Sequence, residues 1–271
     1  MKQLSLPNGD SIYYIDKVTA LYIYNEIYGD EVYLYGGMEI KEGDTILDIG
    51  ANIGLFSRYI SSQAKNLRIF TFEPVPPIFE VLVKNVENIP ASVTNFNFGL
   101  GEKKEKIEFN YYPRVSGDSA AVAPDWESKI DLMVEHYDET VAQDMPIAKL
   151  VPKFLRKRVV RAGIKRMYKP QKVVCKIRPL SEIIEENQID HIEFMKVDAE
   201  NYEWQVLRGI TDADWNKIDQ IALEVHSHIK GGDTLLQDIT TLLKEKGFKT
   251  YLGEESRETM LNVYMLYGKK E

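Results

Sequence analysis

The distribution of apolar and polar residues along the chain predicts strands that alternate with helices. Short runs rich in Ile, Val, Leu and Phe have the length of buried strands, and amphipathic segments separate them. Such alternation is typical of a mostly parallel sheet with helices on both faces. The predicted strands are residues 45–48, 67–72, 92–98, 106–112, 172–178, 191–197, 218–225, 248–252 and 262–267, and the predicted helices are residues 53–64, 76–87, 181–187, 202–209 and 235–246.

The alternation is interrupted in the middle of the chain, where helical stretches occur without strands. We therefore expect one domain with a core of residues 43–115 and 172–271, an N-terminal extension of residues 1–42, and an insertion of about residues 116–171. Long segments near a ligand site often act as lids that exclude water. We expect the insertion to be a helical lid, with residues 116–119 as its hinge.

The composition excludes several classes of protein. The chain has 271 residues, of which 44% are hydrophobic and 28% are charged, as in ordinary globular domains. Its net charge of −8 argues against general nucleic-acid binding, and no apolar run approaches the roughly 18 residues of a membrane span. The single cysteine, Cys175, excludes an intrachain disulfide, and the first residues lack the apolar core of a signal peptide. We therefore expect a cytoplasmic protein.

The most informative motif is DIGANIG at residues 48–54, between a predicted strand and a predicted helix. Glycines there permit a tight turn and close approach of a ligand, and a helix N-terminus favours negative groups. A dinucleotide-binding turn would need glycines at positions 52 and 55, which are Asn and Leu. S-adenosylmethionine (SAM) has a carboxylate instead of phosphates and suits this turn. The predicted SAM-binding residues here are Asp48, which would face the amino group of the ligand directly or through water, and Gly50, Ala51, Asn52 and Gly54.

Glu73 supports the same interpretation, because it ends the strand 67–72 and precedes Pro74. An acidic side chain at this place can accept hydrogen bonds from both ribose hydroxyls of the cofactor. Acids at strand ends also cap the next helix, so Glu73 alone would be weak evidence. The final strands, 248–252 and 262–267, have no helix between them and fit an antiparallel pair. This ending is unusual for an NAD-binding fold and fits the Rossmann-like, seven-stranded sheet of class I methyltransferases.

Four ionisable residues lie where two further predicted strands end. Asp198 and Glu200 follow strand 191–197, and Glu224 and His226 end strand 218–225. Open α/β sheets bind their ligands at this edge, and alternate residues of a strand point to the same side. We therefore predict that these four residues are catalytic and lie beside the methyl donor.

Two chemistries are open to these residues. In the first, His226 takes the proton of an acceptor hydroxyl as a general base, and a carboxylate orients or charges its ring. In the second, Asp198 and Glu224 hold a divalent cation that lowers the pKa of the hydroxyl. A structural alternative is that Asp198 or Glu200 caps the following helix. His228 is a weaker substitute for His226.

With these segments, the sequence resembles the FkbM family of methyltransferases. That family combines Asp-x-Gly-Ala-Asn-x-Gly with Lys-Ile/Val-Asp-x-Glu…Glu…Val-Leu-x-Gly, matched here by residues 48–54 and 196–209. The usual valine and glycine of the second motif are Ala199 and Asn201, and asparagine tolerates the left-handed backbone that the turn requires. The resemblance looks closest to the branch found in polyketide and nonribosomal-peptide biosynthesis. Further matching segments are residues 24–27, 33–34, 214–218 and 262–264.

The insertion and its flank carry an unusual concentration of positive charge. Residues 145–178 contain 12 of the 34 Lys and Arg residues and no Asp or Glu. The rest of the chain therefore contains 22 basic residues and all 42 acidic residues. A segregated basic block indicates a specific anionic partner. The candidates are an acidic carrier protein bearing phosphopantetheine, a phosphorylated small molecule and a membrane surface. A solvated helix face is the structural alternative.

The resemblance implies that the methyl group of SAM is transferred to a substrate hydroxyl, which leaves S-adenosylhomocysteine. We therefore expect an O-methyltransferase that acts on a natural product, either as a free small molecule or bound to an acyl carrier protein. An N- or C-methyltransferase on the same sheet remains an alternative. So does a SAM-binding docking module without catalysis, although the acids and His226 at the strand ends disfavour it.

Overall fold

The computed structural model describes residues 1–143, 145–227, 234–256 and 258–270. Seven of the strands that it describes form the central sheet, and their bounds agree with the prediction to within a few residues. In chain order they are β3 (Thr45–Ile49), β4 (Arg68–Phe72), β5 (Ser92–Phe96), β9 (Phe194–Val197), β10 (Gln220–His226), β11 (Lys249–Leu252) and β12 (Val263–Lys269).

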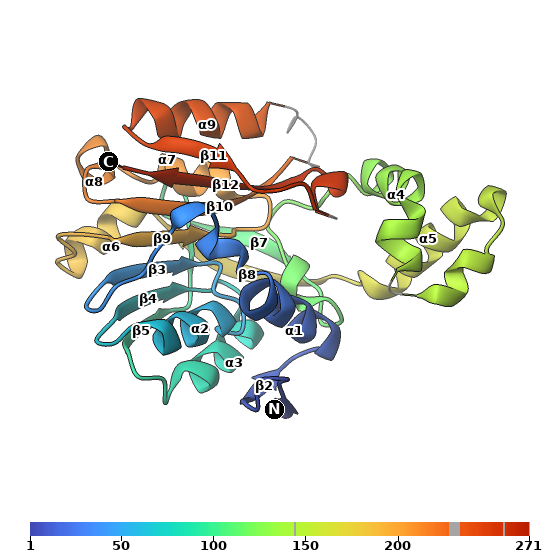
Figure 1. The fold of residues 1–271 in the computed structure, drawn as a ribbon, viewed down its shortest axis with the longest axis horizontal. Coiled ribbons are helices and arrows are strands. Elements are labelled where there is room, and N and C mark those ends of the chain that lie inside the picture. The colour runs from blue at the N-terminus through green and yellow to red at the C-terminus, as the bar shows by residue number, and fades with distance from the viewer. Residues whose placement is uncertain (144, 228–233, 257, 271) are drawn as a thin grey trace.

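Their order in space is β11-β12-β10-β9-β3-β4-β5 (Figure 1). All neighbours are parallel except that β12 is antiparallel to β10 and β11, as predicted for the last two strands. The chain builds the sheet outward from β3 to β5, returns to β9 beside β3, and then builds in the other direction. This order confirms the predicted class I methyltransferase fold. It also makes the ends of β3 and β9 the switch point at which open sheets bind ligands.

Helices cover both faces of the sheet, which explains why β3 is buried along its whole length. Two apolar clusters fill the space between the sheet and these helices. No helix in the described ranges is sufficiently long and apolar to cross a lipid bilayer. On one face lie α2 (Leu55–Gln63) and α3 (Pro76–Val86), and on the other lie α6 (Leu180–Glu186), α7 (Glu203–Arg208), α8 (Asp212–Trp215) and α9 (Leu235–Glu245).

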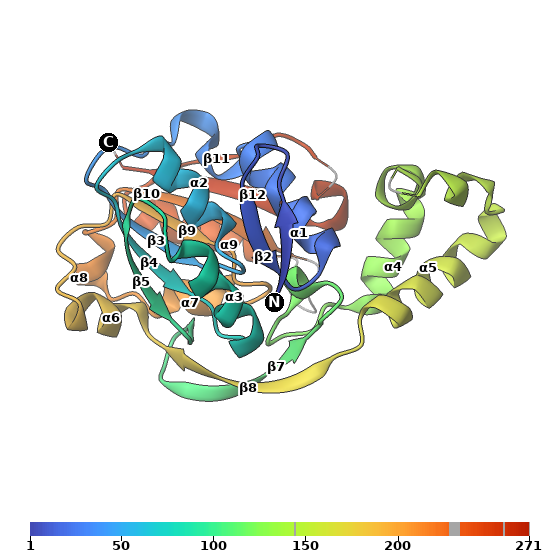
Figure 2. The ribbon, with the colours of Figure 1, turned by 90° about the horizontal axis from the view of Figure 1, so that it is seen from below.

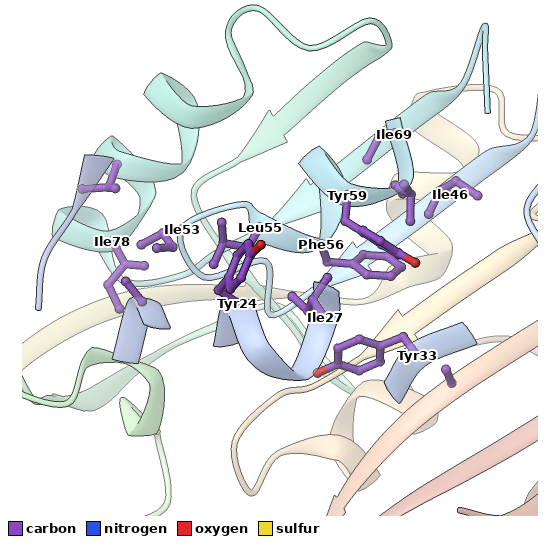
Figure 3. Close-up of a cluster of buried hydrophobic side chains, with 14 of the residues drawn as sticks. Tyr24, Ile27, Tyr33, Ile46, Ile53, Leu55, Phe56, Tyr59, Ile69 and Ile78 are labelled. Carbon is purple, nitrogen blue, oxygen red and sulfur yellow. The ribbon is translucent and has the colours of Figure 1, made fainter. Parts of the chain in front are cut away.

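The N-terminal extension packs into the core. Tyr24, Ile27 and Tyr33 lie against α2 (Figure 3), and the ring of Tyr33 is 5.3 Å from that of Phe56 in an edge-on contact. The apolar residues of the extension therefore belong to the same cluster as those of the sheet. The segment comprises β1 (Lys2–Ser5), β2 (Ser11–Tyr14), α1 (Lys17–Tyr24), the π-helical turn η1 (Asn25–Gly29) and the 3₁₀ segment η2 (Val32–Gly37).

A second sheet lies outside the central one. It consists of β6 (Gly99–Leu100), β7 (Glu105–Tyr111) and β8 (Gln171–Arg178), with β8 in the middle. The predicted strand 172–178 therefore does not extend the parallel sheet. Instead it pairs antiparallel with β7 across the whole insertion. Burial explains this, because β8 buries only one face, through Cys175 and Ile177.

The helical segments between β7 and β8 form an arm that stands to one side of the body in both views (Figure 1, Figure 2). The arm has its own small core of Ile130, Tyr137, Ala142, Ala148 and Val160. Its elements are η3 (Ser116–Asp118), α4 (Trp126–Glu135), η4 (Asp138–Ala142), η5 (Pro146–Leu150) and α5 (Lys153–Met167), and η6 (Thr259–Leu261) belongs to the C-terminal part of the chain.

Candidate active site

The turn after β3 is held tightly against the end of β9. Gly50 and Gly54 have φ angles of +72° and +84°. A Cβ atom on Gly50 would lie 1.7 Å from the carbonyl oxygen of Asp198, and one on Gly54 would lie 2.7 Å from Leu82 in α3. Only glycine fits both the backbone conformation and the space. The motif at residues 48–54 therefore forms the tight turn that the sequence predicts.

A pocket of about 560 Å³, partly open to solvent, borders this turn. Of the predicted cofactor residues, Gly50, Asn52 and Glu73 line it. The two carboxylate oxygens of Glu73 accept hydrogen bonds from the N–H groups of Val75 (2.8 Å) and Asn52 (3.2 Å). Burial raises the pKa of Glu73 to about 8, although these two bonds oppose the shift. Glu73 thus fixes the turn and also faces the pocket.

Asp48 lies beneath the turn and does not line the pocket, and Ala51 and Gly54 do not line it either. The Asp48 carboxylate is fully buried, accepts a hydrogen bond from the Ser57 hydroxyl at 2.6 Å, and lies 3.6 Å from the Lys196 ammonium. Burial raises the pKa of Asp48, and the charge of Lys196 opposes that effect. The structure therefore places Asp48 where it supports the turn, and its contact with the ligand stays a prediction.

A larger hollow of about 1240 Å³, also open to solvent, adjoins the first pocket. Asn52, Gly117, Asp198 and Glu200 line both, so the two spaces meet at these residues. Glu224 and His226 line the larger hollow but not the first pocket. The structure thus brings all four predicted catalytic residues to one wall beside the first pocket. We call the first pocket the cofactor pocket and this larger hollow the acceptor pocket, after the roles proposed for them below.

His226 is held by a carboxylate that the sequence analysis did not single out. Its Nδ1 atom lies 2.7 Å from Oε1 of Glu203, a side chain with no solvent exposure. Its Nε2 atom lies 3.5 Å from Glu200 and 3.6 Å from Glu224. Glu224 and His226 therefore share a side of β10, as predicted. Burial lowers the pKa of His226, but the surrounding carboxylates outweigh it and place the pKa well above 6.5.

The carboxylates around His226 repel one another. Burial, and then the charge of Asp198, raise the pKa of Glu224 to about 8. Burial also raises the pKa of Glu200 well above its usual value, in spite of the nearby His226. The carboxylates of this wall are therefore harder to ionise than carboxylates in water, because burial and neighbouring negative charges disfavour their charged form.

The backbone after β9 directs Glu200 toward His226. Glu200 and Asn201 have φ angles of +44° and +70°, so Asn201 adopts the left-handed conformation expected of it. The Asn201 N–H group donates to Oε1 of Glu203 at 3.0 Å. The N-cap residue of α7 is Tyr202, and its side chain makes no capping hydrogen bond; whether the charge of Asp198 or Glu200 favours this helix end stays a prediction.

Other residues of this wall could not be assigned from strand ends. The hydroxyl of Tyr33, from the N-terminal extension, lies 3.3 Å from both Asp198 and Glu224. The Lys196 ammonium donates to the carbonyl of Gly50 at 2.8 Å and lies 3.3 Å from Asp198. Lys196 and Glu203 are part of the second sequence motif, which was the available signal, whereas nothing in the sequence pointed to Tyr33. His228 lies outside the described residues.

Only the base of the arm borders the acceptor pocket, through side chains such as Trp126, Lys129 and Tyr168. The outer part projects away from the body (Figure 1), so only this base is placed to cover the pocket, and its role as a lid stays a prediction. The predicted hinge is tied down, because the backbone N–H and the hydroxyl of Ser116 both donate to Asp16, at 2.9 and 2.8 Å.

The basic block is partly neutralised by acids that lie outside it in the sequence. Arg156 pairs with Asp138 at 3.6 Å, and Arg161 pairs with Glu127 at 2.6 Å. Folding brings these acids from α4 and η4 alongside α5. Further pairs are Lys157–Asp131, Lys172–Glu108, Arg178–Glu182 and Arg178–Glu186. The block is therefore less positive than its sequence suggests.

Comparison with known proteins finds similar sequences and similar structures. The chain is 31% identical over 258 residues to the AMB antimetabolite synthetase AmbE of Pseudomonas aeruginosa, a match that covers 94% of this chain and 12% of that protein. It is 28% identical over 253 residues to the 31-O-demethyl-FK506 methyltransferase FkbM of Streptomyces tacrolimicus, which covers 92% of this chain and 89% of that one. A putative rRNA methylase structure from Clostridium thermocellum aligns with 11% identity and a TM-score of 0.43, over 93% of this chain and 97% of that one.

The model of the methyltransferase FkbM domain matches residues 48–250. This range contains the turn after β3, Glu73, and the strand ends that carry Asp198 and His226. The chain therefore belongs to the FkbM family of SAM-dependent methyltransferases.

Proposed function

We propose that this protein is an O-methyltransferase that transfers the methyl group of SAM to a hydroxyl of a natural product. The observation that carries the proposal is the shared boundary of the cofactor pocket and the acceptor pocket, with His226 in the wall beside it. A methyl group presented at this boundary would face the acceptor directly. The relative from S. tacrolimicus is named for a 31-O-demethyl substrate, which supports a hydroxyl acceptor.

The proposed catalytic residues are Asp198, Glu200, Glu224 and His226, called the rim cluster below. Gly50, Asn52 and Glu73 are the proposed contacts of SAM. The acceptor oxygen forms a bond to the methyl carbon while the carbon–sulfur bond breaks, and the electron pair stays on sulfur. The hydroxyl proton leaves toward the rim cluster. Because the two pockets meet there, the acceptor oxygen would lose its proton and accept the methyl group at one place.

Methylation with SAM that carries a ¹³C-labelled methyl group tests this proposal. The full chain is incubated with hydroxylated natural products and with amine analogues of the same skeletons, and products are analysed by mass spectrometry and NMR. A new methoxy carbon signal is the expected result. Labelled N-methyl or C-methyl products would assign the protein to another methyltransferase class. If acceptors bind but none of them is labelled, the protein would be a SAM-binding docking module without catalysis.

We further propose that the acceptor is delivered by an acidic carrier protein that docks on the tip of the arm. Ile147, Leu150 and Phe154 expose 73%, 80% and 84% of their surface there. Three basic residues, Lys149, Lys153 and Arg158, are exposed on the same segment of η5 and α5. Apolar side chains surrounded by positive charge suit an acidic protein surface.

The docking proposal is tested with the triple variant Lys149→Glu, Lys153→Glu and Arg158→Glu. These residues are preferable to Arg156 and Lys157, whose reversal would break ion pairs of the arm. The KM for a carrier-bound substrate should rise about three- to tenfold at low salt, because steering mainly affects association. Reversal of the exposed Lys65, Lys106 and Lys244 gives the same charge change elsewhere on the surface and is the control. Equal KM values for both triple variants would reject docking at the tip.

A further inference from the structure

The rim cluster contains donor atoms from two different strand ends in a compact arrangement. Asp198, Glu200 and His226 each supply one oxygen or nitrogen atom, and these three atoms lie within 4.8 Å of one another. Donors that share one divalent ion at bond lengths of about 2.0–2.2 Å lie roughly 3 to 4.5 Å apart. The observed spacing therefore requires only a small contraction around an ion. Two carboxylates and an imidazole form a donor set suited to Mn²⁺ and related divalent cations.

His226 is prepared for such a role by a buried neighbour. Glu203 binds Nδ1 at 2.7 Å, so the ring presents Nε2 to Glu200 and Glu224 in the acceptor pocket. Metal-binding histidines characteristically have their other ring nitrogen held by a carboxylate, which fixes the ring orientation and increases its basicity. A buried acid behind the imidazole is therefore the arrangement expected of a metal ligand.

Two carboxylate oxygens supply an independent observation. Among the residues that the structure describes, Oδ1 of Asp198 and Oε2 of Glu203 find no hydrogen-bond partner; both atoms are inaccessible to solvent, and Glu203 has no exposed surface at all. Buried polar atoms are nearly always satisfied, so such atoms call for an explanation. The other oxygen of Asp198 already contacts Lys196 and Tyr33. A cation at the rim cluster would supply the missing positive charge next to these groups.

The charge of the acceptor pocket points in the same direction. Six acids line the pocket, and its lining cations are Lys129 and His226. Lys129 is already 3.8 Å from Asp118, and His226 is already bound to Glu203. The six acids are Glu26, Asp118, Asp198, Glu200, Glu224 and Glu258. Metal chemistry accounts for this excess of carboxylate more directly than a neutral acceptor does.

We propose that Asp198, Glu200 and His226 form a binding site for one divalent cation in the acceptor pocket. This donor set differs from the pair Asp198 and Glu224 expected from the sequence, because the donor atoms that lie within 4.8 Å of one another belong to Asp198, Glu200 and His226. The inference deepens the proposed function: an acceptor hydroxyl that joins the ion as a ligand has a lowered pKa and loses its proton more easily. Binding of the ion itself does not depend on which acceptor is methylated.

Manganese binding to the chelator-treated full chain tests the site without turnover. Electron paramagnetic resonance of free Mn²⁺ is followed as protein is added, in the absence of SAM and acceptor. One saturable ion per chain is expected, and Glu200→Gln and His226→Ala should each weaken binding about ten- to a hundredfold. Circular dichroism checks that both variants are folded. Wild-type affinity in both variants, or no saturable binding below about 1 mM Mn²⁺, overturns the proposal.

The chain contains a matched control cluster. His191 lies 2.7 Å from Asp219 and 3.9 Å from Glu193 on an exposed part of the surface. Asp219→Asn should leave Mn²⁺ binding unchanged, and loss of binding in this variant would move the site away from the rim cluster. If chelator does not slow methylation, the ion does not take part in catalysis, and the proposed O-methyltransferase activity is unaffected. If Mn²⁺ binds but no hydroxyl is methylated, the proposed function is wrong and the metal site is still supported.

Discussion

The rim of the sheet and the arm contain the same kinds of charged residues in opposite environments. At the rim, the Lys196 side chain is 4% exposed and lies between two carboxylates. On the arm, Arg161 and Glu127 pair at 2.6 Å with 40% and 64% of their side chains exposed. Removal of one partner of a buried pair leaves an uncompensated charge, whereas exposed pairs contribute little. Burial, and not the number of ion pairs, therefore indicates where substitutions will matter.

The largest effect is expected at the rim for His226→Ala. Whether the ring takes a proton or binds a cation, its loss should lower kcat about 10²- to 10⁴-fold while SAM affinity changes little. Steady-state kinetics and calorimetry measure the two quantities separately. His191→Ala removes an exposed histidine paired with Asp219 and should have wild-type kcat. Similar losses in both variants would show that the effect does not come from the rim.

The turn after β3 should be the next most sensitive position. Gly50→Ala places a methyl group against the Asp198 carbonyl and should destabilise the fold by about 2–5 kcal/mol, with loss of SAM binding. Gly43 also has a positive φ, but nothing lies within 4 Å of the position of its Cβ. Gly43→Ala should therefore cost only about 1 kcal/mol. Chemical denaturation measures the free energy of unfolding of both variants. The difference between them gives the cost of the steric clash beyond that of the backbone conformation.

Glu73 provides a pH-dependent test of the cofactor pocket. Glu73→Ala should weaken SAM binding by about 1–3 kcal/mol, as for a lost hydrogen bond to a charged group. In the wild type the folded pKa of about 8 lies above the unfolded value of 4.5, so this group's contribution to folding stability falls as the pH rises from 4.5 and levels off above about 8. Ribose hydroxyls donate to the ionised form, so cofactor affinity should instead rise with pH and level off above about 8.

Calorimetric titration of S-adenosylhomocysteine between about pH 6 and 8.5 measures this dependence. The Glu73→Gln variant cannot ionise at this position, so its affinity should vary less with pH. An equally steep rise in Glu73→Gln would mean that another group is responsible, and unchanged affinity in folded Glu73→Ala would remove Glu73 from the site.

The smallest effect is expected on the arm. Arg161→Ala breaks the exposed pair with Glu127 and should change the free energy of unfolding by about 0–1 kcal/mol, with kcat for a small free acceptor unaltered. Added salt should reduce even this difference, because exposed charges are screened. A loss of more than about 2 kcal/mol would contradict the contrast between rim and arm.

Sequence alone determined the order of strands and helices and the place of the cofactor turn. These features depend on local patterns: buried strands are apolar runs, and the glycines of residues 48–54 meet local backbone demands. The same patterns placed Asp198, Glu200, Glu224 and His226 at neighbouring strand ends. The alternation of side chains in β10 correctly put the last two on one side.

Tertiary structure decided which groups these residues meet. Tyr33 reaches Asp198 from 165 positions away in the sequence. Glu203 meets His226 beyond a turn of two left-handed residues, of which the sequence indicated Asn201 but not Glu200. The basic block acquired counter-ions from α4 and η4 only when the arm folded. Local sequence encodes backbone conformation and burial, whereas pairing of charges depends on long-range packing, which brings distant side chains within a few ångströms.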